Sequence, residues 1–151
     1  KRMINPGRLS TASAYADSPL STRDDVAWSG GPSPGAPAPD CPLADRNGRS
    51  CHLHDALGRD FTLVVFGAAQ IGAVLDGVTL LSIGEDASFR DAEGLFAARY
   101  DAKAGNAYLV RPDTHIAARF RFPTDAKIHA ALARARGFKA MVEMIERAGG
   151  T

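Results

Sequence analysis

The sequence has few of the residues that hold a metal or carry redox chemistry. Its 151 residues include two cysteines and four histidines. Cys41 and Cys51 do not form a CxxC pair, and the histidine spacing gives no zinc signature. His52 and His54 can lie on one side of a strand, as a solvated pair or, alternatively, as a metal site. The cysteines lie on opposite arms of a predicted hairpin, as a cross-strand disulfide or as two half-buried thiols, and a cytoplasmic chain favours the thiols.

Long apolar runs and an excess of one charge are also missing. The longest apolar run, which begins at Phe61, is far too short to span a bilayer. The N-terminus lacks the apolar core of a secretory signal. The formal net charge of +1 indicates neither a nucleic-acid nor a membrane-surface partner. We therefore expect a cytoplasmic protein of one domain with a real core. The chain begins at Lys1 without an initiator Met, which fits a piece of a longer polypeptide.

The first part of the chain has no helical or strand periodicity and is rich in Ser, Pro and Gly. We assign residues 1–37 to an extended arm or linker and residues 38–151 to the folded domain. The arm nevertheless carries the apolar residues Met3, Ile4, Leu9, Tyr15, Leu20, Val26 and Trp28. Each gains about 1.5–3 kcal/mol on burial, so they dock on the following domain or on a neighbour absent from this chain. Because so long a structureless segment is unusual in a compact domain, we favour a missing neighbour. Trp28, the one tryptophan, is expected to fill a packing pocket.

From residue 38 onwards, strand and helix patterns alternate. The expected elements are a hairpin over 41–53, a helical turn over 54–58 closed by Gly58, a buried strand over 61–67, a short helix over 70–76, a second buried strand over 78–84, a helix capped by Asp91 over 91–100, a hairpin over 108–119, and a helix capped by Thr124 that Gly137 interrupts. Asn47-Gly48 and Pro112-Asp113 are typical of tight turns. This order predicts a mixed α/β sheet flanked by helices.

The last hairpin carries the polar candidates for a site. Arg111, Asp113 and Arg119 can anchor an interface or bind an anion. The simpler interpretation is that Asp113 stabilises the turn while the arginines pair locally. For His115 an exposed strand position is preferred to a catalytic role, because the sequence names no partner for it.

Several segments, taken in order, resemble the C-terminal part of FAD-dependent aromatic hydroxylases of the phenol and 3-hydroxyphenylpropionate hydroxylase type. They are Asn5-Pro6-Gly7-Arg8-Leu9-Ser10, Asp17-Ser18-Pro19-Leu20, Pro34-Gly35-Ala36-Pro37-Ala38-Pro39-Asp40, Tyr100-Asp101-Ala102 and Tyr108 to Arg119. The Pro34 to Asp40 type of segment also occurs in peroxiredoxins. The resemblance implies a thioredoxin-like fold, with the hairpin over 41–53 as an N-terminal extension.

The resemblance also implies what the whole enzyme does. Such an enzyme uses FAD, NAD(P)H and oxygen to hydroxylate a phenolic substrate, and this part of it binds no flavin. The present chain has no GxGxxG after a strand, the pattern that lets backbone approach a pyrophosphate. We therefore assign no catalytic, cofactor-binding or metal-binding residue to it. The implied partner is an upstream flavin domain of the same polypeptide, with subunit contacts in a homo-oligomer as a further possibility.

Thioredoxin-like redox chemistry is not expected from this sequence. The reactive Cys should follow the strand that begins at Phe61, where the chain reads Gly67-Ala68-Ala69-Gln70. The cis-proline expected before the last hairpin is replaced by Ala104-Gly105-Asn106. Two alternatives stay open: a free-standing redox or peroxidase protein that uses Cys41 or Cys51, and a small-molecule binding module at the vacant corner near residues 67–70.

Overall fold

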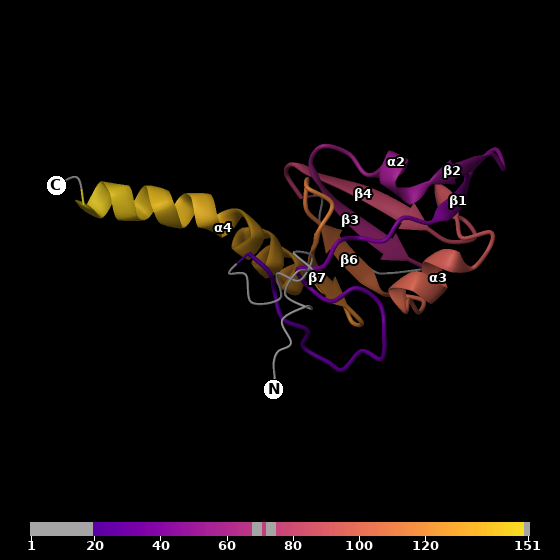
Figure 1. Cartoon of the computed structure of the whole chain (residues 1–151), viewed down its shortest axis with the longest axis horizontal. Helices are drawn as coiled ribbons and strands as arrows, with labels where there is room; N and C mark the ends of the chain where they lie inside the picture. Colours follow the sequence, from indigo (N-terminus) through magenta and orange to yellow (C-terminus); the bar gives the residue numbers. More distant parts are fainter. Residues whose placement is uncertain (1–19, 68–70, 72–74, 150–151) are drawn as a thin grey trace, which may run out of the picture.

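A computed structural model of the chain describes residues 20–67, 71 and 75–149, with backbone alone for 138–149. Figure 1 shows a twisted sheet with short helices against it and a long helix at the C-terminus. The helices and strands, in chain order, are β1 Pro42–Asp45, β2 Ser50–His52, α2 Leu53–Ala56, β3 Phe61–Phe66, β4 Val78–Ile83, β5 Phe89–Arg90, α3 Leu95–Tyr100, β6 Ala107–Val110, β7 Ile116–Phe120 and α4 Asp125–Gly149. This is the predicted mixed α/β sheet flanked by helices.

The sheet combines a parallel centre with antiparallel edges. Its strand order is β2-β1-β5-β4-β3-β6-β7. β3 pairs in parallel with β4 and antiparallel with β6, and β6 pairs antiparallel with β7. A parallel pair, an antiparallel hairpin on its flank and a closing helix form a thioredoxin-like core. The β1–β2 hairpin extends that core at the opposite edge, as the resemblance implies.

Both faces of the central strand β3 are buried, because its alternate residues point to opposite sides of the sheet and each side is covered. From β3, Val64 joins a cluster with Phe96 and Tyr100 of α3. Its neighbours Leu63 and Val65 join a second cluster that includes the first turns of α4. A strand buried on both faces needs a continuous apolar run, and the sequence between Phe61 and Phe66 supplies one.

Local signals in the sequence explain most of the element boundaries. The Asp91 carboxylate accepts 2.9 Å hydrogen bonds from the backbone N–H groups of Phe96 and Ala97 and so satisfies the first turn of α3. Thr124 Oγ1 accepts one of 3.1 Å from Lys127 N–H at the start of α4. The Thr124 cap is confirmed, and Asp91 does bond the first turn of α3, but the helix predicted over 91–100 begins only at Leu95, with Gly94 at its N-cap position.

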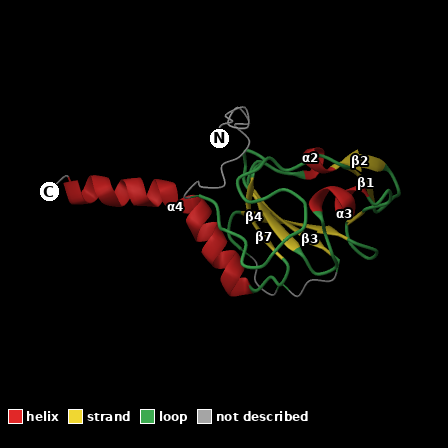
Figure 2. Ribbon diagram, turned by 60° about the horizontal axis from the view of Figure 1, so that its bottom comes forward, coloured by secondary structure: helices red, strands yellow, loops and turns green. Residues whose placement is uncertain are grey.

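Three predictions about elements are wrong. Gly58 does not close the helical turn, because α2 ends at Ala56 and the C-cap position is taken by Leu57, which has extended backbone. β4 is only partly buried, since Thr79 and Leu80 are exposed, Leu80 by 59%. Gly137 does not end the last helix: α4 runs to Gly149, with one sharp bend between two straight parts (Figure 2). A glycine costs an interior helical position about 1 kcal/mol, which the flanking turns outweigh here.

The predicted short helix over 70–76 lies largely outside the described residues. Of its residues, Ile71 and Leu75 pack on the cluster beneath α4. The arm residues Met3, Ile4, Leu9 and Tyr15 also lie outside the described part.

Candidate functional site

Two parts of the described arm, at Thr22 and from Gly35 to Ala38, lie along the outer edge of β7 and the turn before it. Thr22 N–H donates to the Ala117 carbonyl at 2.9 Å, and Gly35 N–H donates to that of Ile116 at 2.7 Å. Ile116 N–H in turn donates to the Ala36 carbonyl at 2.8 Å. The segment therefore satisfies backbone groups that an edge strand would otherwise leave open. The sequence allows the arm to dock on the following domain or on a neighbour absent from this chain. The described part of the arm docks on the following domain.

Arg119 of β7 fixes this segment from the sheet side. Its guanidinium makes a two-pronged ion pair with Asp24, with Nε and NH2 at 3.0 and 2.8 Å from the carboxylate oxygens. NH1 donates to the Gly30 carbonyl at 2.8 Å. The Arg119 side chain is 6% exposed, so the pair is held away from solvent. Such a fork-to-carboxylate arrangement fixes direction as well as distance. The local pairing predicted for Arg119 is wrong, because its partner is 95 residues away in the sequence.

Trp28 is held between two arginines. Its ring centroid lies 4.3 Å from the guanidinium carbon of Arg119 and 3.7 Å from that of Arg121. One edge packs on Tyr108 at 5.8 Å between centroids. Cations over an indole face are attracted by its quadrupole, most strongly when desolvated. The prediction that Trp28 fills a packing pocket is confirmed.

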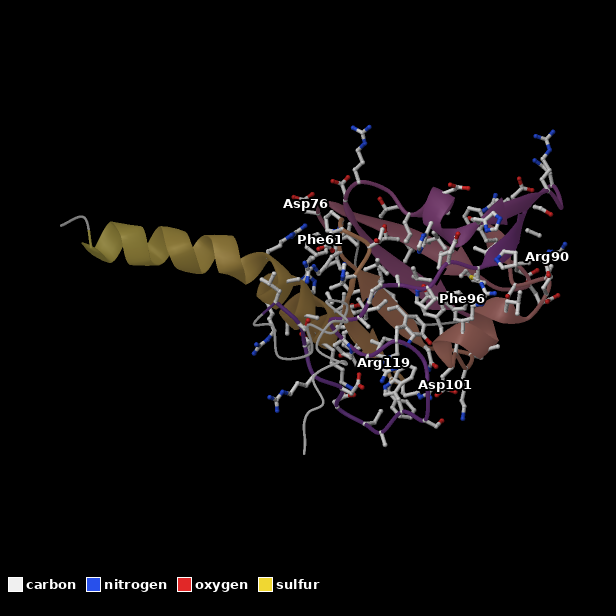
Figure 3. The ribbon with its side chains drawn as sticks, in the orientation of Figure 1. Phe61, Asp76, Arg90, Phe96, Asp101 and Arg119 are labelled. Atoms are coloured by element: carbon white, nitrogen blue, oxygen red, sulfur yellow. The ribbon has the colours of Figure 1, made fainter. Side chains whose placement is uncertain are left out.

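Asp101 completes the other side of the clamp. Its carboxylate accepts hydrogen bonds from Arg121 at 2.7 Å, Ser29 at 3.1 Å and Gly30 N–H at 3.2 Å. Although desolvation acts to raise it, these hydrogen bonds, led by that from Arg121, lower the pKa of Asp101. Figure 3 shows Asp101 and Arg119 on the side of the sheet where this segment passes. We call Asp24, Trp28, Asp101, Arg119 and Arg121 the arm clamp.

Glycine is required where the arm approaches α3. Gly31 has a φ of +78°, and a Cβ placed there would lie 2.5 Å from the Tyr100 carbonyl oxygen. Both the left-handed backbone and the close approach exclude an ordinary side chain.

Asp40, at the end of this segment, organises the region around the two histidines. Its carboxylate accepts backbone hydrogen bonds of 2.9 Å from both Cys41 and His54. Desolvation opposes the shift, but the bonds from His54 and Cys41 lower the pKa of Asp40. His54 Nε2 lies 2.7 Å from the Ala38 carbonyl oxygen, and His52 Nδ1 lies 3.5 Å from Asp40. Within the described part of the chain, no three His, Cys, Asp or Glu side chains are placed to hold a metal ion.

Both cysteines are free thiols, and neither is placed for redox chemistry. Burial, with smaller contributions from Asp91 and Asp40, raises the pKa of Cys41 to about 12. Burial also raises the pKa of Cys51, whose Sγ is 3.7 Å from the Leu43 carbonyl oxygen. Because the thiolate is the nucleophile, groups that stay protonated at neutral pH do not attack a peroxide or disulfide.

The corner after β3 is closed by backbone. Gly67 has a φ of +75°, and a Cβ there would lie 2.9 Å from the Ala104 Cα. Gly105 N–H donates to the Phe66 carbonyl at 2.7 Å, which holds that loop against the strand end. Ala68, Ala69 and Gln70, the rest of the predicted vacant corner, lie outside the described residues. Beside Gly67, an open hollow of about 440 Å³ is lined by Ser82, Gly84 and the acidic pair Glu85 and Asp86.

In the turn of the last hairpin, Arg111 and Asp113 follow the simpler interpretation, in which Asp113 stabilises the turn and the arginine pairs locally. Arg111 pairs with Asp113 across the turn. Asp113 Oδ1 accepts a 3.2 Å hydrogen bond from His115 N–H, and the His115 ring lies beside the same residue. Thr114, whose N–H donates to the Arg111 carbonyl across the turn, adopts the left-handed conformation with φ of 63°. His115 is only partly exposed and bridges to Pro37 of the arm.

None of the helices formed by the described residues combines the length and hydropathy that a membrane span requires.

Comparisons with known proteins find similar folds among solved structures. No protein-family model and no curated protein matches the sequence. The flavin-dependent monooxygenase PieE, solved with FAD and substrate, aligns with 77% of this chain at 23% identity and a TM-score of 0.60. Aklavinone-11 hydroxylase, solved with FAD and aklavinone, aligns with 76% at 23% identity and a TM-score of 0.58. The thioredoxin domain of a thiol-disulfide oxidoreductase from Bacteroides vulgatus aligns with 73% of this chain and 98% of its own, at 15% identity and a TM-score of 0.44.

The aligned part is 24% of each monooxygenase chain, so this chain spans about a quarter of the length of those enzymes. Its fold is that of a portion of FAD-dependent monooxygenases, as the resemblance of its sequence segments implies.

Sequence reasoning named Trp28, Asp101 and Arg119 but missed Asp24 and Arg121 as members of the arm clamp. A weak signal was present for Arg121: it follows Arg119 at the spacing that puts both side chains on one face of a strand. No comparable signal marked Asp24.

Proposed function

We propose that this chain is a non-catalytic C-terminal domain of an FAD-dependent aromatic-ring hydroxylase. The parent enzyme would use FAD, NAD(P)H and oxygen to hydroxylate a phenolic substrate in the cytoplasm. The domain would hold the segment that arrives from the upstream flavin domain, and support packing or subunit contacts. The observation that carries the proposal is the arm clamp. In it, the buried Arg119 of the domain forms an ion pair with Asp24 of the segment that precedes the domain.

The residues of this chain do not fit FAD. A pyrophosphate site needs glycines that open a path to the backbone at a helix N-terminus. Here the glycine after β3 is covered by the Ala104 backbone, and the sequence that follows it is not GxGxxG. The flavin of the parent enzyme would therefore be held by residues outside this chain, and no chemical step is assigned to this domain.

The alternative of a free-standing redox protein using Cys41 or Cys51 has less support. The pKa of its nucleophilic thiol would have to be near or below neutral pH. Burial instead raises the pKa of both thiols.

The proposal is tested on the product of the complete gene. Its intact mass and its absorbance between 350 and 500 nm are measured together. A much longer, yellow protein that consumes NAD(P)H in the presence of a phenol supports the proposal. A colourless product of the present length contradicts it and returns attention to the cysteines, which peroxide turnover of Cys41→Ser and Cys51→Ser variants would then test.

A further inference from the structure

Two exposed apolar side chains, Val26 and Phe122, lie on segments that Lys127 links, and we call these two side chains the apolar patch. Among the described residues, the large apolar side chains with high exposure are Val26 at 36%, Leu80 at 59% and Phe122 at 68%. Val26 belongs to the arm, and Phe122 lies between β7 and α4. Exposed apolar groups that gather in one place, with polar groups around them, are typical of interaction sites.

Lys127 of α4 ties the two parts of this patch together. Its Nζ forms a 2.8 Å ion pair with Asp25, the residue before Val26. The same Nζ donates a 3.1 Å hydrogen bond to the carbonyl oxygen of Phe122. The segments that carry the two apolar side chains are thus fixed to one another by a polar link, and the arm clamp holds the arm in place behind them.

The geometry of the strand explains why Phe122 faces outward. Phe120 packs in the cluster beneath α4, and Arg121 turns to the opposite side, where it covers Trp28. Phe122 follows where the strand has ended and the chain turns towards the Thr124 cap. Burial of this side chain by a partner would be favourable, by about 1.5–3 kcal/mol.

We propose that Val26 and Phe122 form the surface on which the polypeptide upstream of residue 20 docks, so that the upstream domain covers this patch. The occupant is argued from chain continuity. Thr22 is bonded to Ala117 near the start of β7, Asp24 pairs with Arg119 and Asp25 pairs with Lys127, so the described chain begins beside β7 and runs along it towards Phe122. A domain tethered there is present at a high local concentration and reaches this patch before others. This inference rests on the proposed function to the extent that the upstream domain is the flavin domain.

The test compares Phe122→Asp with Leu80→Asp in the complete gene product. Both changes place a carboxylate at an exposed large apolar position, but Leu80 lies on β4, away from the arm. Amide hydrogen exchange is measured by mass spectrometry in the complete product, in both variants and in the 151-residue chain. We expect peptides covering residues 22–27 and 121–124 to be protected at least tenfold in the complete product relative to the isolated chain. Phe122→Asp should abolish that extra protection, and Leu80→Asp should keep it.

Each outcome decides between the two proposals. A yellow, longer product without extra protection at these peptides overturns the docking inference and leaves the proposed function standing. A longer, colourless product with Phe122-dependent protection supports the docking and contradicts the flavin assignment. A gene product no longer than this chain overturns both. Dimerisation of the isolated chain that Phe122→Asp abolishes and Leu80→Asp keeps would assign the patch to a second copy and overturn the docking inference.

Discussion

Arg119 illustrates how a single strand residue joins two distant parts of this chain. A buried guanidinium is costly unless its donors are satisfied, and here Asp24 and the Gly30 carbonyl satisfy them. Its outer face also lies over the Trp28 ring. The guanidinium of Arg119 thus fixes the position and direction of the arm and also holds the ring of Trp28.

Replacing Arg119 should therefore detach the arm locally. We expect Arg119→Ala to lower the free energy of unfolding by about 3 kcal/mol, because it leaves a partly buried carboxylate unpaired. The emission of Trp28, the one tryptophan, should shift to the red as water reaches it. The matched control is Arg111→Ala in the same hairpin, whose turn-spanning pair with Asp113 should be worth less than about 1 kcal/mol. Equal losses from the two variants in urea titrations would contradict the role assigned to Arg119.

A pair of neighbouring glycines provides a second test at this scale. Gly31→Ala should lower the free energy of unfolding by about 2 kcal/mol or more, since alanine is strained at φ of +78° and its Cβ meets the Tyr100 carbonyl oxygen. Gly30→Ala is the control, because the nearest atom to its Cβ is 3.7 Å away, at ordinary contact distance. Thermal unfolding of both variants measures the difference. A Gly31→Ala protein as stable as the parent would argue against a docked arm in solution.

Cys41 should make the protein sensitive to alkali. Its pKa is raised to about 12 in the folded state, whereas an unfolded cysteine ionises near pH 9.0. The unfolded state therefore loses its proton first, so the stability that Cys41 contributes is complete below pH 9 and is lost as the pH rises towards 12. Burial also raises the pKa values of Tyr100 and Tyr108, which act in the same direction. Urea titrations of the parent and of Cys41→Ala between pH 8 and 11 measure the effect. A smaller decline in the variant is expected, and rapid alkylation of native Cys41 at pH 8 would contradict it.

At the scale of elements, α3 depends on a residue outside its own helical span. α3 has six residues and begins after Gly94, which has left-handed backbone and offers no side-chain cap. Asp91 supplies both acceptors instead. The helix in turn carries Phe96 and Tyr100, whose rings stack at 4.3 Å between centroids in the core.

Removal of this cap should destabilise the whole domain. We expect Asp91→Ala to cost about 1–2 kcal/mol, because two backbone donors lose their acceptors. The nearby change Glu93→Ala, at an exposed position, serves as the control. Chemical denaturation with circular dichroism checks the difference, and an indistinguishable pair of midpoints would count against the capping role.

At the scale of the whole molecule, the arm protects an open sheet edge. β7 is the last strand of the sheet, and residues 20–38 occupy its free side. On the other edge, β2 has only three residues, which leaves little strand for another chain to pair with. The described body is thus closed to edge-to-edge association as long as the arm stays in place.

A chain shortened to residues 38–151, the domain boundary predicted from sequence, should lose this protection. The bare β7 edge and the unpaired Arg119 should lower stability and promote dimers or aggregates. Size-exclusion chromatography with light scattering, on the shortened and complete 151-residue chains, provides the measurement. A monomeric shortened chain of unchanged stability would support the sequence boundary and contradict a structural role for residues 20–37.

The sequence by itself determined the elements whose signals are local. Apolar β-branched runs specify β3, turn residues specify the two hairpins, and Asp91 and Thr124 specify helix starts, because each effect acts within a few residues. The missing thiol after β3 likewise led to the expectation, from the sequence alone, that the usual redox chemistry is absent. Only the tertiary structure decided where the arm lies and which acid pairs with Arg119. Those contacts join residues about a hundred positions apart, and their energies depend on burial and on geometry that no local pattern encodes. The same reason accounts for the exposed side of β4, where the absence of packing overrides the local preference of Leu80.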